Sequence, residues 1–213
     1  TTPALAPSDN RLDLTLESRL REDGTLVSRI RVETTGFLET ALRRGLLGQP
    51  LAERLAPLRA IATGLSPAAR ITRTALRPRD LEDLDEALVA ELDVEIPGWA
   101  VPDPAGRLAF VPPAFRHPVQ DRRLWENLLI TNVAARTRGL SFSCPKEIVL
   151  RGETLLPGRY ALRAAKTSGA VETPLGTASW SIKVEGDRLL TEQRAVFRTR
   201  RVSAEDLKDY DRL

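Results

Sequence analysis

Two stretches in which apolar and polar residues alternate constrain the fold more than any other feature of this sequence. The first surrounds a Glu22-Asp23-Gly24 turn, with Leu12, Leu14, Leu16 and Leu20 before it and Leu26, Ile30 and Val32 after it. A period of two places these side chains on one face of a strand, and the glycine-containing turn lets the chain reverse. Residues 11–32 are therefore predicted to form an antiparallel β-hairpin.

A second hairpin is predicted near the carboxyl terminus. The residues that share one face of it are Trp180, Ile182 and Val184 and, after a Glu185-Gly186-Asp187 turn, Leu189, Thr191, Ala195 and Phe197. We expect this face to be buried and the intervening polar residues to be solvated. Ser203 and Asp206 have the spacing of a capping box, which predicts a short helix through Leu207 and Tyr210.

The residues between the two hairpins predict a mixture of helices and strands. Two helices are expected at Phe37–Leu47 and Leu51–Ala62, separated by Gly48 and Pro50. Strands are expected at residues 70–76 and 86–98, with Leu88, Leu92, Val94 and Ile96 on one face of the latter. A short strand near residue 108 leads into a proline-rich connector, and residues 121–136 favour a helix although they contain good strand formers. Residues 139–162 have a strand, turn, strand pattern with its turn at Pro157-Gly158.

These elements predict an α+β protein that is mainly antiparallel β and sandwich-like, with a helical pair inserted after the first hairpin and a short carboxy-terminal helix. With 213 residues, 42% of them hydrophobic, the chain is long enough for one large or two small domains. We expect residues 1–10 to be a linker. Residues 11–118 and 119–213 then form two parts; the alternative is one continuous domain, since the boundary depends on prolines near Pro118 alone.

Composition limits the partners and the compartment only weakly. The net charge is +3, which gives little support for an anionic partner, and we expect neither a nucleic-acid partner nor direct membrane insertion. A single cysteine excludes an internal disulfide. Because the chain contains no methionine, we expect it to be a processed product or a piece of a longer polypeptide.

Three groups of residues are candidates for a site. Glu91, Asp93 and Glu95 occupy alternate positions on one side of a predicted strand, where they are able to hold a hard cation or act as an acid and a base. The competing interpretation is cross-strand pairing with arginines of the first hairpin, namely Arg19, Arg29 and Arg31. We favour this pairing, because calcium sites usually gather their ligands from a loop.

The second candidate is Cys144 with His117, the minimum for nucleophilic acyl transfer. Both residues lie beside a proline, no helix start follows Cys144 to lower its pKa, and a lone cysteine is most often buried. The third is the basic run around Phe197, with Arg194, Arg198, Arg200 and Arg201. The alternation places Phe197 in the core and leaves the arginines as a solvated strand face. We therefore assign no catalytic, cofactor-binding or metal-binding residue.

The order of motifs resembles that of a known family. Leu156-Pro157-Gly158-Arg159-Tyr160, then Thr173, Pro174 and Gly176, and finally Tyr210 resemble the β-rich region at the end of bacterial transglutaminase-like proteins. In these proteins domains of unknown function flank a papain-like core. Asp23, Gly24, Gly36 and Ala41–Arg44 are similar to the segment that follows that core.

The resemblance implies a role without chemistry, because the catalytic Cys, His and Asp of the family lie in the core, and none of the core's motifs is present here. It predicts a noncatalytic accessory module of a cell-envelope or periplasmic protein, which packs against or presents a neighbouring domain and needs no cofactor. The alternatives are a stand-alone protein-binding module and a Cys-His acyl-transfer enzyme that uses Cys144 and His117.

Overall fold

The structure is a computed structural model, and it describes residues 6–50, 53–102, 104–105, 107–115, 138–158 and 168–207. Its helical elements are η1 (Pro7–Asp9), α1 (Gly36–Leu47), α2 (Ala56–Leu65) and η3 (Pro113–Phe115). The long strands are β1 (Arg11–Leu20), β2 (Leu26–Thr34), β3 (Arg70–Arg77), β4 (Val89–Ile96), β8 (Lys146–Leu155), β9 (Ser168–Thr173), β10 (Gly176–Glu185) and β11 (Arg188–Phe197). The short strands are β5 (Val101–Pro102), β6 (Leu108–Ala109), β7 (Leu140–Ser141) and β12 (Arg201–Val202).

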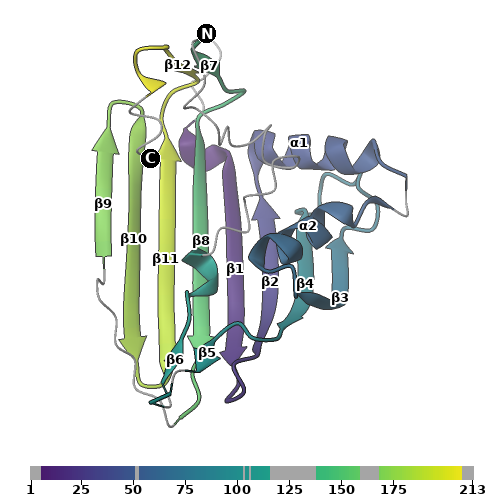
Figure 1. Cartoon of the computed structure of the whole chain (residues 1–213). Helices are drawn as coiled ribbons and strands as arrows, with labels where there is room; N and C mark the ends of the chain where they lie inside the picture. Colours follow the sequence, from purple (N-terminus) through teal and green to yellow (C-terminus); the bar gives the residue numbers. More distant parts are fainter. Residues whose placement is uncertain are drawn as a thin grey trace.

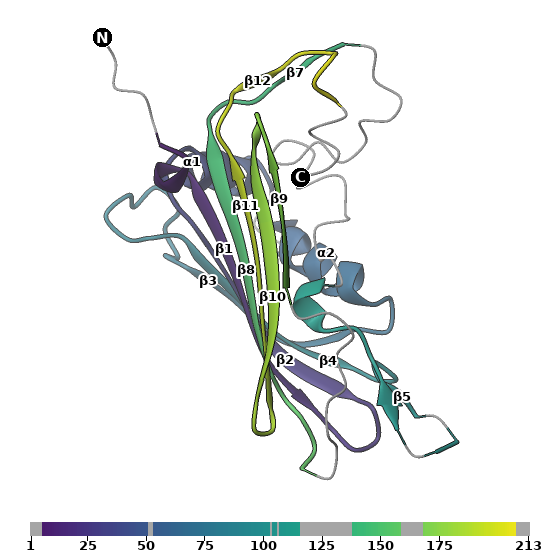
Figure 2. The ribbon, with the colours of Figure 1, turned by 90° about the vertical axis from the view of Figure 1, so that its left-hand side faces the viewer.

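The eight long strands form one sheet in the order β3-β4-β2-β1-β8-β11-β10-β9 (Figure 1). Every neighbouring pair is antiparallel except β1 and β8, which run parallel. The parallel pair is therefore a seam between an amino-terminal half of four strands and a carboxy-terminal half of four strands. Figure 2 views the sheet from its edge and shows α2 and η3 on the same side. We call this side the inner face and the other side the outer face.

The amino-terminal half forms as its alternation predicts. In β1 the side chains of Leu12, Leu14 and Leu16 are at most 2% exposed, and their register partners on β2, such as Ile30 opposite Leu16, are buried with them. Each such side chain stabilises the fold by about 1.5–3 kcal/mol through burial. The hairpin turn needs a glycine, because Gly24 has a φ of 82° and lies directly against the carbonyl of Ala100.

The helical pair covers the inner face of this half, where Leu38 of α1 and Leu58, Ile61 and Leu65 of α2 join the buried core. The first helix has the predicted extent, whereas the second begins at Ala56 rather than Leu51 and continues to Leu65. The proline in the first turn of this helix is Pro57 and not Pro50. A proline is tolerated there because the N–H groups of the first turn make no helical hydrogen bond.

The carboxy-terminal half contains the predicted second hairpin as β10 and β11, in register from Glu185 opposite Arg188 to Gly176 opposite Phe197. The expectation that its apolar face is buried was wrong at one end. Leu189 and Phe197 are buried, but Trp180 and Ile182 are only half-buried and Val184 is 48% exposed. These side chains are less buried because the described element that covers this part of the inner face is η3, which is three residues long.

The contacts of η3 explain where it sits. Ala114 packs above Gly152 of β8, where an added Cβ would lie 3.2 Å from the Cβ of Ala114. Gln193 donates a hydrogen bond from Nε2 to the carbonyl of Ala114 at 3.0 Å, and Phe115 meets Trp180 edge to face, with ring centroids 6.0 Å apart. A glycine in mid-strand therefore marks a close approach of two backbones.

The prediction of an α+β protein with mainly antiparallel strands is confirmed. The sandwich-like detail is not confirmed, because the strands of both halves join one large sheet. The predicted helix at 121–136, the strand through Tyr160 and Leu162, and the boundary at Pro118 lie outside the described residues. At the carboxyl end Ser203 Oγ accepts from the Asp206 amide at 3.2 Å, as a capping residue should, and the rest of the predicted helix lies outside the described residues.

Candidate functional site

The row of three carboxylates lies on the outer face of β4, and arginines contact every one of them. Directly opposite on β2, Arg29 pairs with Asp93 at 3.0 Å and Arg31 with Glu91 at 2.7 Å. Beyond β2, Arg21 reaches Glu95 at 2.5 Å. The predicted pairing is thus confirmed for Arg29 and Arg31, whereas Arg19 was a wrong assignment whose place Arg21 takes.

The edge strand adds a second arginine to two of these carboxylates. Arg73 of β3 lies 3.9 Å from Asp93, and Arg77 lies 3.2 Å from Glu91. The hydrogen bond from Arg29 to Asp93 raises the pKa of Arg29 above its ordinary value. Because opposite charges face each other on neighbouring strands, the row stabilises the sheet instead of gathering around an ion.

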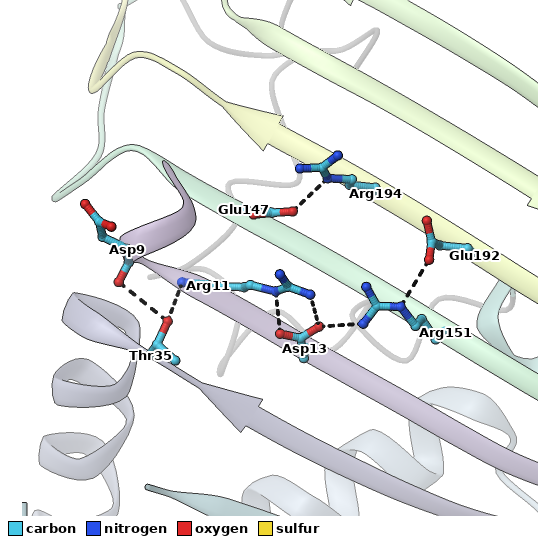
Figure 3. Close-up of polar contacts among 8 residues, drawn as sticks. All are labelled: Asp9, Arg11, Asp13, Thr35, Glu147, Arg151, Glu192 and Arg194. Carbon is cyan, nitrogen blue, oxygen red and sulfur yellow. Dashed lines mark hydrogen bonds and ion pairs between the residues drawn. The ribbon is translucent and has the colours of Figure 1, made fainter. Parts of the chain in front are cut away.

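The same arrangement continues across the parallel seam (Figure 3). Asp13 of β1 accepts from Arg11 on its own strand and from Arg151 of β8 at 2.9 Å, and Arg151 also contacts Glu192 of β11 at 3.0 Å. Nearer the start of β8, Arg194 pairs with the buried Glu147 at 2.7 Å. The outer face therefore carries a ladder of ion pairs from β3 to β11.

Neither a metal cluster nor a membrane span is found in the described part of the chain. Within it no three histidine, cysteine, aspartate or glutamate side chains lie together in a way that would hold a metal ion. The helices described there are also too short or too polar to cross a bilayer.

The second candidate pair is not brought together by the described residues, because His117 lies outside them. Cys144 is 3% exposed, and burial raises the pKa of its thiol, an effect that nearby Lys146 and Arg200 oppose. A nucleophilic cysteine needs a lowered pKa and access to a substrate. The geometry around Cys144 has neither property.

A buried lysine, which the sequence analysis did not select, lies beside Cys144. Lys146 is 3% exposed, and its Nζ sits 4.3 Å from the centre of the Phe142 ring and 5.5 Å from that of Phe197. Burial lowers its pKa to about 8, because a charged amine is poorly solvated there. The sequence contained a signal for this burial, because Lys146 occupies an alternate position with Ile148 and Leu150 and therefore shares their apolar face.

The basic run near the carboxyl terminus behaves as the alternation predicts for Phe197 and Arg194, but the prediction of one continuous strand face was wrong, because β11 ends at Phe197 and Arg201 lies on β12. Phe197 is 6% exposed and faces inward, opposite Lys146, while Arg194 lies on the outer face. Arg194 pairs with Glu147, and Arg198 lies 3.4 Å from Glu172. Arg194 therefore belongs to the ladder of the outer face.

Arg43 of α1 is a second buried cation that the sequence analysis missed. Its guanidinium donates to the carbonyl oxygens of Leu81 and Asp83, at 2.9 and 2.8 Å, to that of Glu86 at 2.5 Å, and to the carboxylate of Glu39 at 2.7 Å. These bonds hold the loop between β3 and β4 against the helix. A glutamate four residues before an arginine on a helix was the available signal.

The chain matches no protein-family model, no curated protein and no solved structure. What supports a function is therefore the arrangement of this chain's own residues together with the resemblance of its motifs.

Proposed function

We propose that this chain is a noncatalytic accessory or interaction module of a bacterial transglutaminase-like cell-envelope protein, and that it packs against or presents a neighbouring domain. The observation that carries the proposal is the exposed apolar end of the inner face on β10. Val184 is 48% exposed there and follows the half-buried Ile182 on the same face. Exposed apolar surface on a sheet favours contact with another folded unit.

The charged residues support the same proposal from the other side of the sheet. The carboxylates of the candidate row on β4, such as Asp93 and Glu91, are engaged by arginines of neighbouring strands. The buried thiol of Cys144 has a raised pKa, which does not suit a nucleophile. The outer face thus favours a structural role, and the open inner face favours an interface.

The first test establishes whether a neighbouring domain exists. An antibody against this region would detect the natural polypeptide in fractionated cells, and mass spectrometry would give its intact mass. A mass well above 23.5 kDa in the envelope fraction is the expected result. A mass near 23.5 kDa would overturn the accessory role and favour the stand-alone module.

The second test addresses the interface. The neighbouring domain, produced separately, is titrated into the chain while amide hydrogen exchange is followed. We expect protection along β10, and we expect Val184→Asp to weaken binding at least tenfold. Leu84→Asp is the matched control, because Leu84 is 79% exposed but lies on the loop between β3 and β4. Equal effects of the two variants, or no protection at β10, would contradict the proposed surface.

A further inference from the structure

The two edges of the large sheet differ in the features that prevent strand addition. The edge strand β3 carries Arg70, Arg73 and Arg77, and its register with β4 shifts between Ile71 and Arg73. Basic side chains and register shifts of this kind protect an edge strand from pairing with another chain. The opposite edge strand, β9, has the sequence SGAVET, pairs with β10 without a shift, and contains no base and no proline.

The free side of β9 is a template for another strand. In the part of the chain that the structure describes, β9 pairs with β10 and with no other strand. Figure 1 shows it as the outermost arrow of the carboxy-terminal half. In an antiparallel pair every second residue turns its N–H and C=O away from the partner, so β9 presents a row of such groups to its free side. Its side chains on both faces are small, since five of its six residues are Ser, Gly, Ala, Val and Thr.

The strand that best matches this edge is β9 of a second copy. A twofold axis through Ala170 places Ala170 opposite Ala170, Gly169 opposite Val171, and Ser168 opposite Glu172. Opposed residues then share a face, as continuation of a sheet requires. The single carboxylate of the strand meets a neutral hydroxyl that is able to donate to it, and no like charges are opposed.

Charge on the outer face favours the same register. Ser168 lies opposite Ser181 of β10, and Lys183 is the next outer-face residue along that strand. Glu172 of one copy therefore approaches the side of the sheet that carries Lys183 in the other copy. Pairing of β9 with β3 lacks this match, because β3 presents three arginines and a shifted register.

We propose that two copies of this chain associate through antiparallel pairing of their β9 strands, with Ala170 at the twofold axis. The two eight-stranded sheets then continue into each other. In this register five residues of each copy, 168–172, lie opposite one another, a contact smaller than a standard stable interface, so we expect a weak dimer whose population rises with concentration. This surface lies apart from the apolar end of β10, so the inference does not depend on the proposed docking of a neighbouring domain.

Sedimentation equilibrium of the 213-residue chain tests the proposal directly. The expected result is a mass that rises with concentration from 23.5 kDa toward twice that value. Ala170→Lys places two lysines opposite each other at the axis and is expected to weaken the dimer at least tenfold. The matched control is Ser179→Lys, because Ser179 is the exposed outer-face partner of Ala170 on β10, one strand away from the edge. A monomer at every concentration, or equal effects of both lysines, would overturn the proposal.

The register is tested by a crosslink. In a Cys144→Ala background, Ala170→Cys brings two cysteines to opposed positions, whose Cα separation of about 4.5–5.5 Å is within the range of a disulfide. Oxidised glutathione is expected to convert this variant to a covalent dimer, and to leave Ser168→Cys in the same background monomeric. Circular dichroism confirms that each variant is folded. Crosslinking of Ser168→Cys in preference to Ala170→Cys would contradict the assigned register.

Discussion

In the amino-terminal half of the sheet the inner face lies under α1 and α2, whereas in the carboxy-terminal half the described covering is the single turn η3. The first half buries Leu16 and Ile30 completely, and its edge strand β3 carries three arginines. The second half leaves Val184 48% exposed, and its edge strand β9 carries no base. Within the described residues, the first half thus has the better-covered inner face and the more protected edge strand, and both of the proposed contacts are assigned to the second half.

The two halves also bury their cations differently. Arg43 in the first half donates to three carbonyl oxygens and to Glu39, so its hydrogen-bonding capacity is used. Lys146 in the second half lies over the rings of Phe142 and Phe197, and its pKa falls to about 8. The buried arginine therefore holds its loop in place in its charged form, whereas the lowered pKa of the buried lysine means that its charged form is less favourable in the folded state than in the unfolded state.

The largest effect is expected from cavities made in the two cores. Leu16→Ala removes a side chain that is 0% exposed and should lower the free energy of unfolding by about 3–5 kcal/mol. Ile182→Ala in the half-buried face of β10 should cost about 1 kcal/mol, because solvent already reaches that site. Urea denaturation of both variants measures the contrast. Equal losses would mean that Ile182 is as well covered as Leu16, and the comparison of the halves would fail.

The next effect concerns the buried arginine. Arg43→Met removes the side-chain donor of the Leu81, Asp83 and Glu86 carbonyl oxygens and the ion pair with Glu39, and should lower stability by about 2–4 kcal/mol. The loop between β3 and β4 should also become sensitive to limited proteolysis. Arg44→Met is the matched control, because Arg44 is exposed on the same helix and should be neutral. A stable Arg43→Met protein with a resistant loop would contradict the assigned role.

A smaller effect follows from the titration of Lys146. Its pKa rises from about 8 in the folded state to 10.5 in the unfolded state, so between these values the unfolded state binds more protons. The free energy of unfolding must therefore increase with pH as Lys146 loses its proton in the folded state, by about 1 kcal/mol between pH 7 and pH 9. The buried thiol of Cys144 acts in the opposite direction above pH 9.0, because its folded pKa is raised from that value.

The measurement removes this opposing thiol. In a Cys144→Ala background, urea denaturation at pH 7, 8 and 9 should show the increase. Lys146→Met in the same background should abolish the increase and raise stability at pH 7, since an apolar side chain replaces a poorly solvated charge. An unchanged slope in the Lys146→Met variant would show that another group is responsible.

Local patterns made most of the fold predictable. The alternation from Leu12 to Val32 and from Trp180 to Phe197 is a property of neighbouring residues, and both predicted hairpins are present. The parallel pairing of β1 with β8 was not predictable, because it joins Leu12 to Ile148 across more than a hundred residues and leaves no periodic signal. The exposure of Val184 was missed for the same reason: alternation shows which side chains share a face, but not what covers that face.

The candidate sites also differ in how well the sequence predicted them. Pairing of Glu91 and Asp93 with Arg31 and Arg29 was expected from charge alternation along each strand, and the structure shows it between β2 and β4, which are adjacent in the sheet but not consecutive in the chain. Lys146 was missed because only the apolar residues of its strand were considered, although Lys146 alternates with them and lies on the same face. Ion pairs that follow from charge alternation along each strand were thus accessible from sequence, whereas the burial of Lys146 against Phe197, a residue of another strand, was not.

The smallest effect is expected from the outer face, where the two halves are alike. Asp93→Asn weakens contacts with Arg29 and Arg73, and Glu153→Gln weakens the contact with Arg188 at 3.0 Å in the other half. All three arginine partners are more than half exposed, so each change should lower stability by about 0.2–1 kcal/mol at low salt and by less at 1 M NaCl. Urea denaturation at the two salt concentrations measures this. If Asp93→Asn cost several kcal/mol at either salt concentration, the ladder would be a major source of stability, and the advantage of the amino-terminal half would no longer rest on its covered core.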